Sequence, residues 1–421
     1  ILKITDKKFG SRRGGEDMHF VLKSKAAMSF KKLNNIQKKV IIFSLALCVA
    51  VLTMCLAPAV AYADFADRAD DVDFSSFDDY INSLDKEQQD ALNFTSVKEL
   101  VEKLLSGESD DFFSGFYSAF SSAALNYFFS FLPSFLAIVT ISVFTAILTQ
   151  AVSGFKKKET EEVVRFVTFA AISTILLVII GNIATMCVTL LGNLGKISAF
   201  LFPPLLTIVS GLGGHATVAT LQPMMAIMSS GIIALINSLI LPVFLSTTVL
   251  SIVGNLSSQV SLDKLSGGFK TFGTFVLGGV FSLFVTFITF QGITTSAFDS
   301  VSFNASKYMV SSYVPILGGY VSEGFDLAVA GVVLLKNSIG YVGMLLLLAT
   351  ILFPLVKVLI FVLCLKFCSA VIEPIGEKRI ANMLSQLSKN SMLLVTAIIG
   401  VTFMFLVLIM LVITSCNMGV I

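Results

Sequence analysis

Residues 291–340 have the sequence QGITTSAFDSVSFNASKYMVSSYVPILGGYVSEGFDLAVAGVVLLKNSIG and lie between two long apolar runs. A chain that only had to turn at a membrane surface would use a short loop here. This stretch is too polar to face lipid, and it is too apolar for a free linker. Long structured connections are typically functional. We therefore expect a folded external segment that the surrounding helices hold in place.

Charged side chains and a turn motif make this stretch and the run that follows it the candidate functional region. An ionisable group at membrane depth costs roughly 2.5–3.5 kcal/mol and normally faces protein or water. The candidate pore-lining or partner-contact residues are Asp299, Lys307, Pro315, Gly318, Gly319, Glu323, Asp326, Lys336 and Lys357. For Lys336 and Lys357, two interpretations stay open: a polar seam that contacts a conduit or partner, or side chains that only snorkel to an interface.

Composition places the chain among helical membrane proteins. It has 421 residues, of which 55% are hydrophobic and 13% charged, against about 25% charged residues in soluble proteins. The N-terminal part is basic, whereas residues 64–111 are strongly acidic. That contrast is typical of segments on opposite sides of a membrane, and it gives no indication of nucleic-acid binding. We expect an all-α, polytopic fold with broken or re-entrant helices.

A secretory signal peptide is predicted before residue 64. A basic stretch precedes an apolar run over 40–60, and the small-residue motif Ala61-Tyr62-Ala63 ends just before Asp64. This is the pattern of a leader that is cleaved between Ala63 and Asp64. The alternative is an uncleaved first membrane anchor. In both cases Asp64 lies outside the cytoplasm.

Three regions follow from these boundaries. Residues 1–63 form an N-terminal extension and the signal peptide, and residues 64–122 form a small acidic, helical, extracytoplasmic region. Residues 123–421 form the polytopic transmembrane domain, with about six to eight spans. The half-polar segment 291–340 is its external part.

Two overlong apolar regions leave the number of crossings open, because residues 197–254 and 326–373 must each cross an odd number of times. Residues 197–210 contain Pro203-Pro204 and are short, so we expect a re-entrant or interfacial piece rather than a span. Farther on, Pro223 and Pro242 are expected to divide or kink the run over 218–253.

Basic loops give the orientation. Lys and Arg gather at residues 156–165, 264–270 and 378–389, whereas the opposite loops carry few. By the positive-inside rule these three loops are cytoplasmic, which places the mature N-terminus and the segment 291–340 outside.

No motif for catalysis or cofactor binding is found. Gly195-Lys196 lacks the flanking residues of a phosphate-binding loop, and His19 and His215 do not form a metalloprotease motif. Cys364 and Cys368 share a helix face, but no His or further Cys completes a metal set. We expect that the chain is not an enzyme and that it binds no cofactor and no metal. Paired glycines at 267–268, 278–279 and 318–319 are expected to permit close helix approach or sharp turns.

Several motifs of residues 291–340 resemble the stage III sporulation protein AE family of endospore-forming Firmicutes. The motifs are Ala297-Phe298-Asp299-Ser300-Val301-Ser302-Phe303, Lys307-Tyr308, Val314-Pro315-Ile316-Leu317-Gly318-Gly319-Tyr320, Glu323-Gly324-Phe325-Asp326 and Lys336-Asn337. The resemblance covers most of the chain after the leader. The extension before Met18 departs from the pattern expected of the family.

The resemblance implies a non-catalytic, multi-pass subunit of a channel between mother cell and forespore, required after engulfment and located in the mother-cell membrane that surrounds the forespore. The implied partners are other membrane and ring-forming subunits, a separate secretion-type ATPase and a forespore-side channel protein. The first alternative is a permease with its own substrate pocket at the broken helices. A second is an assembly factor that only anchors ring proteins.

Overall fold

The computed structural model describes residues 75–82, 84, 88–89, 110–153, 158–256, 262–313, 318–375 and 377–416. The chain divides into residues 1–57 and 58–421, and all described residues belong to the second unit. The predicted cleavage site at Ala61, Ala63 and Asp64 therefore lies outside the described residues. Within the described ranges the elements are helices, and no strand occurs, which confirms the predicted all-α class.

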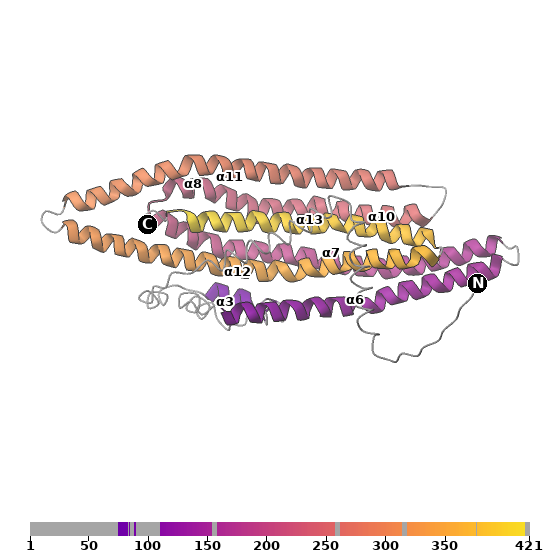
Figure 1. The fold of residues 1–421 in the computed structure, drawn as a ribbon. Coiled ribbons are helices and arrows are strands. Elements are labelled where there is room, and N and C mark those ends of the chain that lie inside the picture. The colour runs from indigo at the N-terminus through magenta and orange to yellow at the C-terminus, as the bar shows by residue number, and fades with distance from the viewer. Residues whose placement is uncertain are drawn as a thin grey trace, which may run out of the picture. The chain divides into compact units, whose positions relative to one another are not determined.

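Long helices account for most of the second unit (Figure 1). A short helix, α3 (Ser75–Asn82), precedes α6 (Asp110–Ser153) and α7 (Lys158–Gly211). Next come α8 (His215–Ala226), a π-helical segment (Ile227–Ile232), α9 (Ile233–Leu235), a second π-helical segment (Ile236–Ile240) and α10 (Leu241–Leu256). The last are α11 (Asp263–Tyr313), α12 (Gly318–Ile372), a 3-10 turn (Glu373–Ile375) and α13 (Lys378–Thr414).

Six helical runs in the described part of the chain are long and apolar enough to cross a membrane: Ser118–Ala151, Thr160–Gly211, His215–Leu256, Asp263–Gln291, Val329–Ile375 and Lys378–Thr414. Residues 218–253 thus fall in a single run, as do residues 329–373, whereas residues 197–210 belong to the end of the run before. At about 1.5 Å per residue, the 54 residues of α7 extend roughly 80 Å, whereas a bilayer core is about 30 Å thick. Parts of these helices must therefore lie outside the hydrocarbon.

The expected re-entrant piece at residues 197–210 is wrong, because α7 continues through it to Gly211. Pro203 and Pro204 lie on the exposed side of the helix. The opposite side is fully buried at Leu201, Leu205 and Val209, and Phe202 stacks on Phe405 of α13, with 6.2 Å between ring centroids. This packing holds the helix together where two amide donors are missing.

The run from His215 to Leu256 is also not divided at its prolines. Pro223 lies inside α8, and Pro242 is the second residue of α10. Between the two prolines the helix widens into the two π-helical segments. Such segments accommodate irregular stretches without ending a helix. The run is therefore irregular, but it is continuous.

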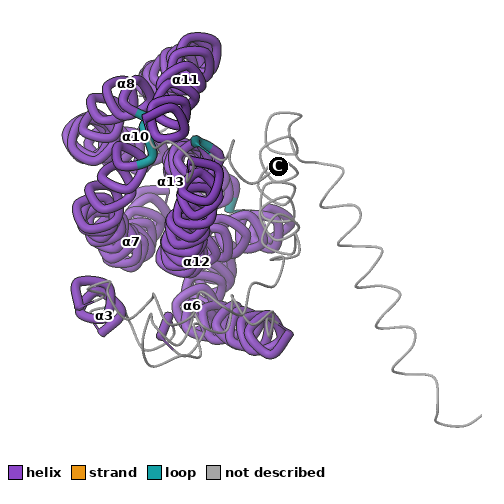
Figure 2. The backbone as a smooth tube through the Cα atoms, turned by 90° about the vertical axis from the view of Figure 1, so that its left-hand side faces the viewer, coloured by secondary structure: helices purple, strands orange, loops and turns teal. Residues whose placement is uncertain are grey.

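Burial separates the helices into an inner pair and a periphery (Figure 2). In the most apolar 18-residue stretch of α12 and of α13, two thirds of the residues are buried, whereas in α11 only 11% are. Helices α6, α7, α10 and α11 all contact α12 or α13. Helix α6 runs without a break across residue 122, where the sequence places a domain boundary; that boundary stays a prediction.

Close helix contacts occur at other glycines than expected. A Cβ at Gly267, Gly268, Gly278 or Gly279 would meet no atom within 4 Å. On α12, by contrast, a Cβ at Gly340 would collide with Ile413, and one at Gly343 would collide with Leu201. The expectation for the glycine pairs at 267–268 and 278–279 is therefore wrong, because these residues lie on the little-covered helix α11.

Candidate functional site

The half-polar stretch forms the C-terminal end of α11 and the N-terminal end of α12 (Figure 1). In the sequence the apolar run of α11 ends near Phe290 and charged residues recur from Asp299 to Asp326, yet α11 continues to Tyr313 and α12 starts at Gly318. We call residues 292–313 and 318–328 the hairpin. At about 1.5 Å per residue its arms are roughly 33 Å and 17 Å long.

The structure places most of the predicted contact residues on this hairpin. Asp299 and Lys307 lie on α11, and Gly318, Gly319, Glu323 and Asp326 lie on α12. Pro315 falls outside the described residues. The contacts predicted for these positions with a conduit or a partner stay predictions.

Lys336 is buried where α12 passes the end of α13. Its side chain is fully buried, and its ammonium group donates a hydrogen bond to the carbonyl of Ser415. Ser415 follows the last turn of α13, where helix carbonyls lack amide donors and the helix dipole is negative. In this structure Lys336 thus caps α13, and its predicted contact with a partner stays a prediction.

Lys357 joins α12 to α6. Its ammonium nitrogen lies 5.2 Å from the ring centroid of Tyr127, within the range of a cation–π interaction. This interaction lies beside a buried apolar cluster that includes Ala123 and Phe353. As at Lys336, the charge contributes to packing between helices within the chain.

The predicted inner loops come together at one end of the helices. Arg165 lies 3.3 Å from Glu377 and 3.0 Å from Glu161. Lys270 donates to the carbonyl of Lys389 over 2.7 Å. The basic segments 156–165 and 264–270 thus each contact residues 377–389, as expected of three basic segments on one side of a membrane.

A buried polar cluster that sequence reasoning missed joins α10, α11 and α13. The Asn390 amide donates to Ser251 Oγ at 2.8 Å and to the Thr247 carbonyl at 3.2 Å. Ser266 donates to the same carbonyl at 3.3 Å and lies 3.2 Å from Ser251 Oγ. Ser251, Ser266 and Asn390 are all at least 95% buried. The four-residue spacing of Thr247 and Ser251 was the available signal, since it places both on one helix face.

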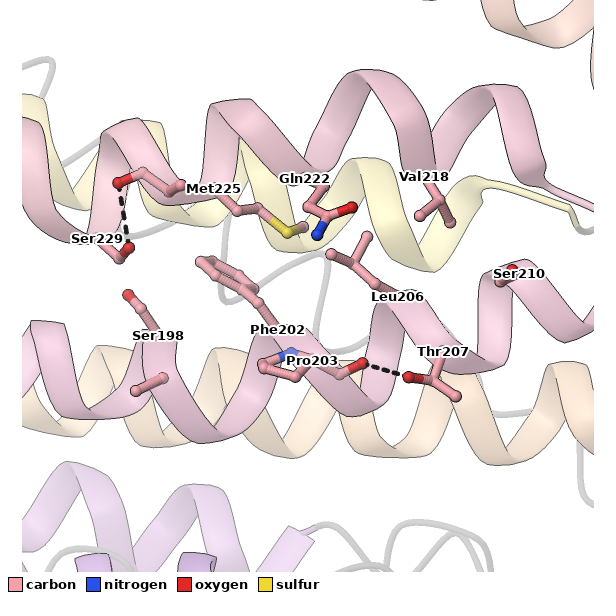
Figure 3. A pocket seen from close by; sticks show the side chains of 12 residues that line it. Ser198, Phe202, Pro203, Leu206, Thr207, Ser210, Val218, Gln222, Met225 and Ser229 are labelled. Carbon is pink, nitrogen blue, oxygen red and sulfur yellow. Dashed lines mark hydrogen bonds between the residues drawn. The ribbon is translucent and has the colours of Figure 1, made fainter.

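A groove of about 520 Å³ separates α7 from α8 (Figure 3). Its lining mixes apolar and polar side chains: Ser198, Ala199, Phe202, Pro203, Leu206, Thr207, Ser210, Val218, Gln222, Met225, Ala226 and Ser229. Figure 3 shows the Gln222 amide pointing between the helices. Ser198, Thr207 and Ser229 each donate their proton to a carbonyl of their own helix turn. These hydroxyls therefore face the groove as hydrogen-bond acceptors.

Metal ligands do not gather in the part of the chain that the structure describes. No group of three His, Cys, Asp or Glu side chains is placed to hold an ion there. Cys364 and Cys368 are buried on α12 as free thiols. They pack as small apolar side chains do.

Comparison with known proteins agrees with this architecture. The family model of stage III sporulation protein AE matches residues 95–416. A curated relative, stage III sporulation protein AE of Bacillus subtilis (strain 168), is 25% identical over 218 residues, which is 52% of this chain and 55% of the relative. The match thus spans about half the length of that relative. No solved structure matches the chain. From the family match over most of its length, the chain belongs to the stage III sporulation protein AE family.

Proposed function

We propose that this chain is a non-catalytic, multi-pass subunit of the channel between mother cell and forespore, required for spore development after engulfment. The observation that carries the proposal is the hairpin. Six runs are long and apolar enough to anchor the chain in a membrane, and α11 and α12 extend through the half-polar stretch with charged residues on both arms. A protein that only anchored others would not need helices of this length.

In this proposal the basic helix ends around Arg165 and Lys389 face the mother-cell cytoplasm. The hairpin then projects into the space between the two membranes, where it contacts the ring-forming and forespore-side subunits. A separate secretion-type ATPase works from the cytoplasmic side. The mature N-terminus is extracytoplasmic.

Charge reversal on the hairpin tests this role. Asp299→Lys with Glu323→Lys should arrest sporulation after engulfment and should release partner subunits during purification from sporulating cells. The matched control is Lys196→Glu, because Lys196 is an exposed charge on α7. Normal sporulation with full retention of the partners in the hairpin variant would contradict the docking role.

One observation favours a permease as the second candidate. The groove between α7 and α8 has polar lining and lies beside Pro203, as expected of a substrate site at an irregular helix. Purified chain alone should not move a defined solute into liposomes if it serves only as a channel subunit. Uptake that is lost in Gln222→Ala and Ala226→Leu variants would favour the permease instead.

A further inference from the structure

Pro354 interrupts the hydrogen-bond ladder of the central helix α12. Proline has no amide hydrogen, so the carbonyl four residues before it loses its helical partner. That carbonyl belongs to Thr350, which is fully buried. A buried carbonyl without a donor costs about 1–3 kcal/mol. Prolines inside helices are a common cause of kinks, and the buried Thr350 carbonyl needs another donor to replace the missing bond.

Gln88 supplies the missing donor from the far N-terminal side of the sequence. Its side-chain amide donates to the Thr350 carbonyl at 3.1 Å, and the side chain is 5% exposed. Tyr80 binds the same residue, with 2.8 Å between its hydroxyl and Thr350 Oγ1. Because the Thr350 hydroxyl donates to the Leu346 carbonyl, Tyr80 is the donor in this pair.

The segment that carries Tyr80 and Gln88 is folded on itself. The Gln89 amide donates to the carbonyls of Ile81, Asn82 and Leu84 over 3.0–3.2 Å, around the end of α3. Adjacent glutamines thus have different partners: Gln89 closes the segment and Gln88 binds α12. We call residues 75–82, 84, 88 and 89 the N-terminal clamp.

The clamp also reaches a second proline site. The Tyr80 ring lies 5.3 Å from the ring of Phe200 on α7, and Phe200 precedes Pro204 by four residues. Ile81 and Leu84 are each 5% exposed. The clamp therefore packs with apolar as well as polar groups beside both interrupted helices.

We propose that the N-terminal clamp holds α12 in one fixed shape across Pro354 by completing the hydrogen bond that Pro354 cannot make. The lock lies between two functionally different halves of the helix. The half before Thr350 continues into the hairpin at Gly318, and the half after Pro354 ends at the basic side near Glu377. When the clamp leaves, the Thr350 carbonyl loses its donor and α12 bends there, so the hairpin moves relative to the basic end.

A double-variant cycle tests the lock on the full-length chain. Gln88→Glu keeps the side-chain size, but its carboxylate cannot donate. Pro354→Ala restores an amide at position 354, so the Thr350 carbonyl no longer needs Gln88. By hydrogen exchange, Gln88→Glu should speed exchange of the α12 amides around Thr350 roughly tenfold, as expected for one lost hydrogen bond. In the Pro354→Ala background the same change should have little effect.

The control is Lys196→Glu, an exposed charge on α7 that should leave the α12 amides unchanged. Equal effects of Gln88→Glu in both backgrounds, or no effect in either, would overturn the proposal. The Gln88→Glu variant could fail to accumulate in cells. In that case the double variant with Pro354→Ala is compared: recovery of the protein level supports the lock, and a level that stays low overturns it.

Spin labels test the bend itself. In a chain whose cysteines are replaced by serine, labels at Ala330 and Phe367 lie on the two halves of α12; Phe367 is 71% exposed. A straight helix separates these positions by roughly 55 Å. Gln88→Glu should shift the distance distribution to shorter values only while Pro354 is present. An unchanged distribution would overturn the bending step.

Discussion

Gly343 of α12 lies so close to Leu201 of α7 that a Cβ at this glycine would overlap the Leu201 side chain. Leu201 is fully buried and has little room to move. Gly343→Ala should therefore lower the free energy of unfolding by about 1–3 kcal/mol, the usual cost of overpacking a core. Thermal unfolding in detergent measures this loss.

Two further variants give this prediction its controls. Gly278→Ala, on the open side of α11, should be neutral or should stabilise the chain by up to about 1 kcal/mol, because alanine favours the helix. When Leu201→Ala is combined with Gly343→Ala, the total loss should be smaller than the sum of the two single losses, because the new Cβ then has room. Equal effects at Gly278 and Gly343 would mean that α7 and α12 do not pack as described.

Lys336 should tolerate an apolar replacement better than a reversed charge. Lys336→Met removes the hydrogen bond to the Ser415 carbonyl and should cost about 1.5–3 kcal/mol, typical of a bond to a charged group. Lys336→Glu also buries an unpaired anion against the negative end of α13, so its cost should reach about 3–5 kcal/mol. The amount of folded protein in membranes, measured by size-exclusion chromatography, ranks the two variants.

The exposed Lys196→Glu provides the baseline for Lys336. If both Lys336 variants fold like the wild type and yet sporulation stops, the lysine acts on a partner rather than as a helix cap. That outcome would favour the interpretation that Lys336 contacts a conduit or a partner.

The fold class could be predicted because long apolar stretches with few charges indicate membrane-crossing helices, whatever their number. The course of α7 could not. Pro203 and Pro204 indicate a break when only neighbouring residues are considered, whereas the helix continues because Leu201, Leu205 and Val209 pack behind them. Packing between distant segments outweighs the local signal there.

The residues at which helices contact each other were harder to predict, because packing between distant segments decides them too. Gly278 and Gly343 look alike in sequence, and only the arrangement of helices decides which one meets a neighbour. The sequence describes the N-terminal region chiefly as acidic, because carboxylates dominate its composition. Among the residues of this region that the structure describes, Tyr80, Ile81, Leu84 and Gln88 are buried. Tyr80 and Gln88 bind Thr350, which lies more than 250 positions away.

Alkaline pH should weaken the contact of Tyr80 with α12. Burial raises the pKa of Tyr80 from 10.0 to about 12, although the hydrogen bond with Thr350 opposes the shift. A raised pKa means that the folded state holds the proton after the unfolded chain has lost it. The stabilisation is complete below pH 10 and is lost as the pH rises to about 12, by roughly 3 kcal/mol.

Tyr80→Phe isolates this effect. The variant loses the hydroxyl, so its stability should fall less steeply than that of the wild type between pH 10 and 12. Chemical denaturation at fixed pH values gives the difference between the two curves. Parallel curves across that interval would show that Tyr80 is not buried against Thr350.

The polar cluster around Asn390 should respond differently to single and to complete removal. Asn390→Leu leaves Ser251 Oγ and the Thr247 carbonyl without their amide donor. We expect a loss of about 1–3 kcal/mol, as for other unsatisfied buried groups, or less if water enters. Replacing Ser251 and Ser266 by alanine in the same chain removes most of the stranded polar atoms, so the triple variant should be more stable than Asn390→Leu alone. Unfolding in detergent compares the variants, and a triple variant less stable than the single one would mean that the serines contribute through packing rather than through this hydrogen-bonded cluster.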